Sequence, residues 1–230
     1  MLEAYELYLR QVRVNEDETG RPAGYPFTIP LFQHFQPLTF HKPLTFITGD
    51  NGTGKSTLIE AIAVGMGFNP EGGTRNFQFS TRETHSSLYQ ALTLAKGVRR
   101  CRDGFFFRAE SFYNVASEIE NIAAEDSRML TGYGGVSLHK MSHGESYLTL
   151  LRSRLSGHGF YIFDEPESAL SPTGQFAMLA IMNDLIQEDS QLVIATHSPI
   201  LLACPQAEIL EIQDDVLVPV SYDESQAVNL

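Results

Sequence analysis

Residues 44–57 have the sequence LTFITGDNGTGKST, in which an apolar stretch leads into a glycine-rich turn. Residues 49–56 fit the pattern G-x-x-x-x-G-K-[ST], which binds phosphate groups when it lies between a strand and a helix. A helix N-terminus attracts anions through its unpaired N–H groups and dipole, and glycines let the backbone approach closely. The stretch therefore predicts a buried strand over 44–48, a phosphate-binding loop and a helix over 55–66.

The residues of this loop have expected contacts with a nucleotide. Lys55 is expected to reach the β and γ phosphates and to take part in catalysis, while the Ser56 hydroxyl coordinates Mg²⁺. Thr57 is expected to add a contact to the α-phosphate. The predicted ATP-binding residues of the loop are Gly49, Asp50, Asn51, Gly52, Thr53, Gly54, Lys55, Ser56 and Thr57.

Residues 160–165, FYIFDE, place two acids directly after four apolar residues. We expect a buried strand beside the strand of the phosphate-binding loop, with its acidic end near the metal. Asp164 would bind Mg²⁺ directly or through a coordinated water. Glu165 would align and polarise the attacking water as the catalytic base or acceptor. Acids often end strands, so the functional interpretation depends on the pattern following a phosphate-binding loop.

The composition limits the classes of protein that fit. The chain has 230 residues, 43% of them hydrophobic, and a formal net charge of −12. This acidity argues against a surface that binds nucleic acid or anionic membrane broadly. Cys101 and Cys204 are the only cysteines and have no C-x-x-C spacing, so we expect a reducing, cytoplasmic location. The sequence shows no secretory signal and no run of about 18 apolar residues, so we expect no direct membrane insertion.

Apolar strands alternate with helices along the chain, which predicts an α/β fold with a mostly parallel, doubly wound sheet. Residues 4–14 and 27–41 predict an antiparallel N-terminal β portion. We expect one domain, with a core lobe of residues 1–69 and 141–230 and an inserted small helical lobe of residues 70–140. Further strands are expected at 104–109, 160–163 and 192–195, helices at 81–96, 112–126, 144–155, 171–189 and from 198, and a hairpin over 207–220 that turns at 214–215.

A second predicted anion site precedes the acidic strand. Residues 141–146, MSHGES, come directly before a predicted helix. They resemble the signature of ABC ATPases, L-S-G-G-Q, or L-S-G-G-E in the SMC and RecF-like branch. In that family the signature covers the γ-phosphate of ATP bound to the opposite subunit. The resemblance implies this role for Ser142, Gly144 and Glu145.

Two shorter motifs follow in the order typical of the same family. Residues 168–171, SALS, resemble the D-loop, with Ser171 in place of the usual aspartate. Ser171 is also a predicted helix N-cap, and both roles are compatible. His197 follows the apolar strand at 192–195 and resembles the switch histidine that contacts the γ-phosphate. The resemblance makes His197 a predicted catalytic residue.

Five ordered motifs within residues 44–203 thus identify the chain as similar to P-loop ATPases of the ABC type. The chain resembles the SMC and RecF-like branch without its coiled coil, since only 84 residues separate Thr57 from Ser142. The stretches TRNFQFSTRETHS, DGFFFRAESF and SHGES are also similar to small bacterial ATPases with AAA-type domain labels. The resemblance implies Mg-dependent ATP hydrolysis in an ATP-dependent homodimer. Such a dimer would act on a protein partner or on nucleic acid, in repair or defence.

Two other functions remain open from the sequence. The chain would also suit the nucleotide-binding subunit of a membrane ABC transporter. A small-molecule kinase with the same loop is a third hypothesis, but it gives no reason for the signature or for His197.

Several individual residues keep two interpretations. Gln78 is a candidate for the glutamine that senses the γ-phosphate in the family, or an ordinary loop residue. Tyr25 or Phe27 would stack on adenine, and Arg13 would approach the nucleotide or remain an exposed strand cation. A basic cluster would contact a phosphate backbone or form a solvated helix end; its members are Lys96, Arg99, Arg100 and Arg102. Of residues 105–107, FFF, at least two rings are expected in the core.

Overall fold

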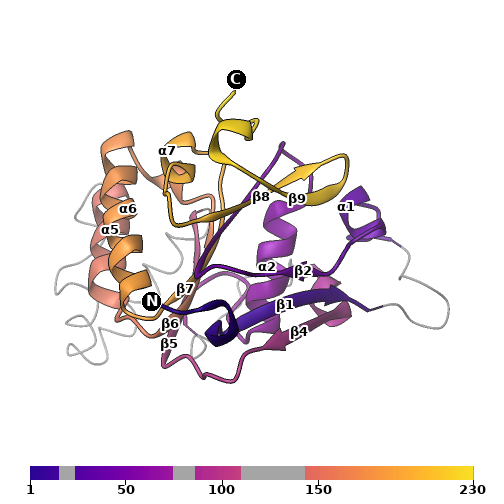
Figure 1. The fold of residues 1–230 in the computed structure, drawn as a ribbon, viewed down its shortest axis with the longest axis horizontal. Helices are drawn as coiled ribbons and strands as arrows, with labels where there is room; N and C mark the ends of the chain where they lie inside the picture. Colours follow the sequence, from indigo (N-terminus) through magenta and orange to yellow (C-terminus); the bar gives the residue numbers. More distant parts are fainter. Residues whose placement is uncertain (16–23, 75–85, 110–142, 230) are drawn as a thin grey trace.

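The computed structural model describes residues 1–15, 24–74, 86–109 and 143–229. Ser142, Gln78 and the predicted helix over 112–126 lie outside the described residues. The predicted α/β fold is confirmed: a six-stranded, mostly parallel sheet lies beside a three-stranded antiparallel one (Figure 1).

The main sheet has the strand order β5-β6-β7-β3-β8-β9. All neighbouring strands are parallel except β8 and β9, which form an antiparallel hairpin. The strands are β3 (Leu44–Thr48), β5 (Asp103–Arg108), β6 (Gly159–Asp164), β7 (Gln191–Ala195), β8 (Glu208–Gln213) and β9 (Val216–Val220). Because parallel strands end at a common edge, residues that follow β3, β6 and β7 come together there.

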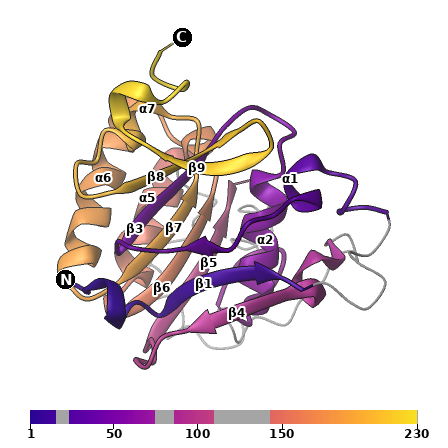
Figure 2. The ribbon, with the colours of Figure 1, turned by 45° about the vertical axis from the view of Figure 1, so that its right-hand side comes forward.

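Helices cover both faces of this sheet, as Figure 2 shows. Successive apolar residues of a strand pack on opposite faces, so that Phe46 joins one hydrophobic cluster and Ile47 the other. Helix α2 (Lys55–Gly65) lies on one face. Helices α5 (His143–Arg154), α6 (Pro172–Gln187) and α7 (Pro199–Leu202) lie on the other. The predicted doubly wound arrangement is therefore confirmed.

The antiparallel sheet has the order β2-β1-β4 and packs on the α2 side. Its strands are β1 (Leu9–Val14), β2 (Leu38–Thr39) and β4 (Leu92–Lys96). Gln191 of β7 joins this sheet to the main one. Its fully buried amide accepts a hydrogen bond from the Leu9 N–H and donates one to the Leu9 carbonyl, both at 2.9 Å.

Short helical elements lie before, between and after these strands. They are η1 (Ala4–Glu6), α1 (Pro30–Gln33), η2 (Ser87–Ala91), η5 (Pro166–Ala169) and η6 (Tyr222–Glu224). The predicted N-cap at Ser171 is confirmed, since its hydroxyl accepts from the Gly174 N–H. At the start of α7, the Ser198 hydroxyl accepts from the Leu201 N–H in the same way. The hairpin turns at Asp214 and Asp215, both in the left-handed region at φ 46° and 65°.

Two expectations differ from the structure. The described part of the predicted helix over 81–96 is η2 followed by β4, because the alternating segment LTLAK pairs with β1. Strand β6 does not lie beside β3, since β7 lies between them. The inserted lobe of residues 70–140 stays a prediction, since residues 75–85 and 110–140 lie outside the described residues. Strands β4 and β5 belong to its described part, and each pairs within one of the two sheets.

Candidate functional site

The loop after β3 has the backbone that its glycines predict. Gly54 is the N-cap of α2 at φ +103°, and Gly49 lies at φ +136°. A Cβ on Gly49 would lie 3.0 Å from the Ile212 Cβ, so strand β8 also leaves no room for a side chain. Only glycine combines this φ with such a close approach. The N-terminus of α2 therefore opens at the carboxyl edge of the sheet, where an anion would meet its N–H groups.

Lys55 is folded back onto its own loop. Its Nζ donates to the Gly49 carbonyl at 2.8 Å and to the Asp50 carbonyl at 2.7 Å, and the residue is only 4% exposed. Burial lowers the pKa of Lys55, while the carboxylates of Glu165, Asp164, Asp50 and Glu167 oppose that shift. The loop lysine and the acidic strand end thus share one electrostatic environment.

Glu165 follows β6 in a strained conformation. Its φ of 48° and ψ of 54° lie in the left-handed region, which non-glycine residues rarely adopt. The Glu165 N–H donates to the Ala195 carbonyl at 3.0 Å, which fixes the turn against the end of β7. The Glu165 Oε1 then lies 3.4 Å from the His197 Nε2. The structure therefore brings two predicted catalytic residues into contact.

Glu167 is a further acid of this site that the sequence analysis did not single out. Its Oε1 accepts a hydrogen bond from the His197 N–H at 2.6 Å. Tyr147 of α5 is fully buried nearby; burial raises its pKa, as do the charges of Glu167 and Asp164. Glu167 therefore links the loop after β6 to the loop after β7, close to the helix that follows the signature.

Arg108 and Glu60 also meet the acidic strand end. Arg108 is the last residue of β5 and the register neighbour of Asp164 on β6. Its Nη1 lies 2.6 Å from the Glu60 Oε2 of α2, and its Nε lies 3.7 Å from the Asp164 Oδ2. The sequence offers one signal for Arg108: like Asp164, it is a charged residue that directly follows a run of apolar residues and ends a strand. Nothing local predicts Glu60, because it reaches the site from the middle of a helix.

The signature side is described only from His143 onward. Gly144 and Glu145 lie in the first turn of α5. A Cβ on Gly144 would lie 3.1 Å from the Ala169 carbonyl, so the start of α5 packs closely on the D-loop-like segment. A cavity of about 380 Å³ opens between them, and Gly144, Glu145 and Ser171 are among its lining residues. The relation of Ser142 to this cavity lies outside the described residues.

A cavity of about 300 Å³ lies beside the phosphate-binding loop. Thr48, Gly49, Asp50 and His197 line it on one side, and Gln226 and Asn229 of the C-terminal segment line it on another. The buried Glu211 holds that segment, since its Oε1 accepts from the Gln226 N–H at 3.0 Å and from the Ser225 hydroxyl at 3.3 Å. The last described residues therefore form a wall of the candidate site.

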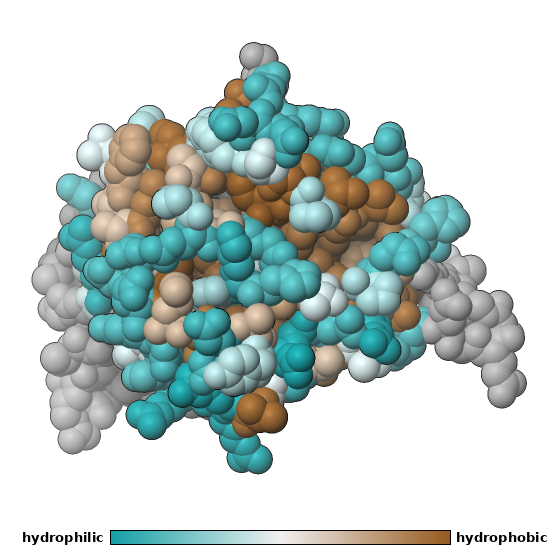
Figure 3. Space-filling view, viewed as in Figure 1, coloured by the Kyte–Doolittle hydropathy of each residue, from teal (hydrophilic) through white to brown (hydrophobic). Residues whose placement is uncertain are grey.

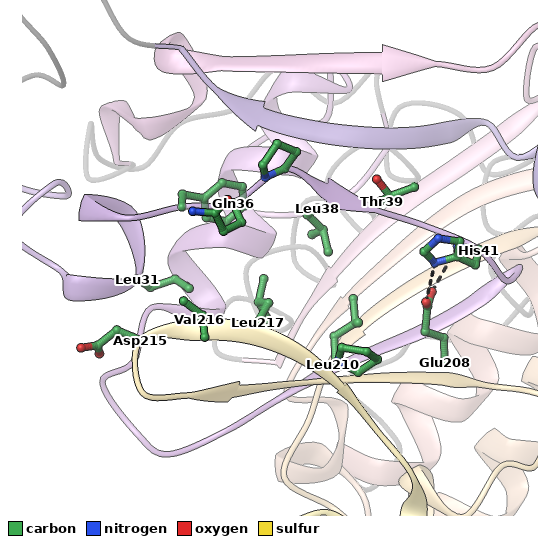
Figure 4. A pocket seen from close by; sticks show the side chains of 13 residues that line it. Leu31, Gln36, Leu38, Thr39, His41, Glu208, Leu210, Asp215, Val216 and Leu217 are labelled. Atoms are coloured by element: carbon green, nitrogen blue, oxygen red, sulfur yellow. Dashed lines mark hydrogen bonds and ion pairs between the residues drawn. The ribbon is translucent and has the colours of Figure 1, made fainter.

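A second cavity of about 300 Å³ is mainly apolar and is lined by residues of α1, β2 and the β8–β9 hairpin. Figure 3 shows hydrophobic surface gathered in a hollow over this part of the molecule. In Figure 4, Leu38, Leu210 and Leu217 lie around the cavity, and His41 pairs with Glu208 at one end through a 2.8 Å contact. Within the described residues, its lining includes none of the predicted catalytic side chains.

The remaining candidates take less central positions. Tyr25 is 66% exposed, whereas Phe27 is buried in the core. Arg13 is exposed and donates to the Gln11 side chain, and Arg99 pairs with Asp189 at 3.1 Å. Lys96, Arg100 and Arg102 are exposed. All three rings of residues 105–107 are buried, which confirms the expectation for that strand.

The oxygen ligands at this edge fit a magnesium ion. Ser56 lies in the first turn of α2, which packs against β6, and Asp164 ends β6 with only 6% of its surface exposed. Mg²⁺ binds few protein oxygens and takes its other ligands from water and substrate phosphates. A hydroxyl and a carboxylate near a phosphate-binding loop therefore suit this metal.

Comparisons with known proteins agree with this arrangement. An AAA-domain family matches residues 29–127, and a second, whose description names the AbiEii toxin and a Type IV TA system, matches residues 124–203. The chain is 27% identical over 197 residues to the macrolide export ATP-binding/permease protein MacB of Hahella chejuensis, covering 75% of this chain and 28% of that protein. It is 28% identical over 165 residues to the cytochrome c biogenesis ATP-binding export protein CcmA of Aliivibrio fischeri, and this match covers 68% of this chain and 79% of that protein.

The fold also has relatives among solved structures. The head domain of an SMC protein, solved bound to the C-terminal winged-helix domain of ScpA, superposes with a TM-score of 0.52 at 12% identity, covering 94% of this chain and 99% of that one. Within the described ranges, no helix is long and apolar enough to cross a membrane.

Proposed function

We propose that this chain, which is a P-loop ATPase of the ABC and SMC-like kind, closes on Mg-ATP as a head-to-tail dimer of two copies. The observation that carries the proposal is the contact between Glu165 and His197 at the edge of the sheet where α2 begins. An acid that can accept a proton from water then lies beside a residue that can contact a γ-phosphate.

Each residue has a proposed role in hydrolysis. Lys55 leaves the carbonyls of Gly49 and Asp50 and binds the β and γ phosphates. Ser56 and Asp164 hold Mg²⁺, which neutralises charge on the phosphates. Glu165 orients the attacking water and accepts its proton, and His197 fixes the γ-phosphate.

The partner subunit completes the site in this proposal. Ser142, Gly144 and Glu145 of one copy cover the γ-phosphate bound to the other. The close packing of Gly144 on Ala169 supports a common surface formed by the signature helix and the D-loop-like segment. Each half-site would bind the nucleotide weakly, and the two half-sites would bind it tightly when they act jointly. ATP binding would then drive dimer assembly, and ATP hydrolysis would reverse that assembly.

The variant Glu165→Gln tests both the catalytic role of Glu165 and the ATP-dependent dimer. Loss of the carboxylate is expected to slow hydrolysis roughly 10²–10⁴-fold, the usual contribution of a general base. Because ATP then persists, size-exclusion chromatography with light scattering in Mg-ATP should show twice the molar mass of the nucleotide-free protein. Glu188→Gln, an exposed residue at the end of α6, is the matched control and should behave like wild type. A monomeric Glu165→Gln variant in saturating Mg-ATP contradicts the dimer.

We further propose that the ATP-driven cycle acts on a protein partner or on nucleic acid, as in repair or defence. The same cycle would suit the nucleotide-binding subunit of a membrane transporter, and the export-protein names of two relatives favour that alternative. ATPase assays with and without DNA or RNA test the first role. Co-purification with an integral membrane protein tests the second.

A further inference from the structure

Arg108 lies between two acids that belong to different elements. Its guanidinium is 2.6 Å from the Glu60 carboxylate of α2 and 3.7 Å from the Asp164 carboxylate of β6. The side chain of Arg108 is 23% exposed, that of Glu60 is 8% exposed and that of Asp164 is 6% exposed, so solvent screens these charges weakly. The shorter contact is to Glu60, and Arg108 therefore pairs more closely with the helix than with the metal-binding strand.

Asp164 is the residue that would bind Mg²⁺ in the proposed function, on which this inference rests. A guanidinium near that carboxylate lowers its affinity for a metal ion, because the two cations repel each other and compete for the same oxygens. Glu60 counteracts this effect in two ways. Its negative charge balances Arg108, and its 2.6 Å contact keeps the guanidinium oriented toward α2.

We propose that the Glu60–Arg108 pair sets the charge beside Asp164 and thereby the affinity of the site for its metal ion. Arg108 is a positioning residue that pairs with Asp164 while no metal is bound. Glu60 retains Arg108 when Asp164 turns to the metal. The net charge of the pair explains the expected effect of each variant. The pair is neutral in the wild type, loses a negative charge in Glu60→Gln and loses a positive charge in Arg108→Gln. In the double variant the pair is neutral again.

The test is direct metal binding, measured with Mn²⁺ by electron paramagnetic resonance in the presence of a non-hydrolysable ATP analogue. Glu60→Gln should weaken Mn²⁺ binding by roughly tenfold, because Arg108 then pairs fully with Asp164. Arg108→Gln should bind Mn²⁺ as tightly as wild type or more tightly. The double variant should return to within about threefold of wild type, since the added charge is gone.

Arg154→Gln is the matched control. Arg154 pairs with Asp103 at 2.8 Å at the opposite end of β5, and its side chain is 20% exposed. Removing this pair changes a similar contact far from Asp164, so Mn²⁺ affinity should not change.

Other outcomes overturn the inference in distinct ways. If Glu60→Gln, Arg108→Gln and the double variant all weaken Mn²⁺ binding equally, the pair is only a structural link. If Arg108→Gln weakens binding of the analogue in EDTA, Arg108 contacts phosphate instead. If Mn²⁺ has no effect on binding of the analogue to the wild-type protein, the proposed magnesium site itself is wrong. This outcome contradicts the proposed function, and it is seen without any change to Glu60 or Arg108.

Discussion

At the scale of single residues, Glu165 combines a proposed catalytic role with an unfavourable backbone conformation. Its left-handed conformation is maintained by the Ala195 carbonyl and by Ser168, whose N–H and hydroxyl both donate to the Glu165 carbonyl. A non-glycine residue in this conformation costs about 1 kcal/mol or more. The surrounding hydrogen bonds offset that cost and direct the carboxylate toward His197.

This strain can be measured by comparing Glu165→Gly with Glu165→Ala. Both variants lack the carboxylate and should lose ATP hydrolysis. Glycine adopts positive φ freely, so Glu165→Gly should exceed Glu165→Ala in free energy of unfolding by about 1 kcal/mol. Urea denaturation of the two variants gives this difference directly. Equal stability would mean that the turn relaxes to an ordinary conformation.

At the scale of elements, Asp103 ties β5 to α5 and β6. Its carboxylate pairs with Arg154 at 2.8 Å and accepts from the Tyr161 hydroxyl at 2.8 Å and the Ser156 hydroxyl at 3.2 Å. Burial alone would raise the pKa of Asp103, but Arg154 and the hydrogen bonds from the Tyr161 hydroxyl and the Gly104 backbone lower it below its usual value. The ionised form is therefore the one that stabilises the fold.

Asp103→Asn is expected to lower the free energy of unfolding at pH 7 by about 1–3 kcal/mol, because a charge-assisted network becomes neutral. A depressed folded-state pKa gives stability that is present above the unfolded value, near 4, and lost as pH falls through the folded value. The wild type should therefore lose stability more steeply than Asp103→Asn below about pH 4. Urea titrations at several pH values measure both slopes, and parallel slopes would contradict the assignment.

The elements that the sequence predicts well are those with strong local signals. Strands β3, β6 and β7 are apolar runs, α2 follows the glycine loop, and the β8–β9 hairpin turns at two adjacent aspartates. The segment 81–96 is harder to predict, because LTLAK fits the periodicity of a helix as well as that of a strand. Its pairing with β1 also joins residues that are far apart in the chain. Local patterns do not contain that pairing.

The same distinction applies to the site. Glu165 and His197 are in contact, and the charge of Glu165 acts on Lys55, because each of the three lies shortly after a strand of the main sheet or begins the helix that follows one. Glu60, Arg108 and Glu167 belong to no motif quoted from the sequence. They reach the site through contacts between elements that are far apart in the sequence, and these contacts depend on a strand order in which β7 separates β6 from β3.

At the scale of the whole molecule, the two sheets depend on Gln191. Its buried amide satisfies both backbone groups of Leu9, across a sequence separation of 182 residues. Gln191→Leu keeps most of the volume but leaves a buried N–H and a buried carbonyl without their partner. We expect a loss of about 2–6 kcal/mol in free energy of unfolding, at about 1–3 kcal/mol for each group.

Chemical denaturation followed by circular dichroism measures this loss. Gln187→Leu, at the exposed end of α6, is the control and should change stability by less than about 0.5 kcal/mol. A small effect of Gln191→Leu would show that the contact with Leu9 contributes little to joining the sheets.

Strand β9 forms one edge of the main sheet and carries Pro219 opposite Leu210. Proline has no N–H, so this border offers an incomplete ladder to any incoming strand. Copies of the protein are thereby discouraged from merging into a continuous intermolecular sheet. At this edge, the proposed dimer would therefore form through loops and helix ends rather than by strand pairing, so that a bound nucleotide could determine whether the two surfaces fit.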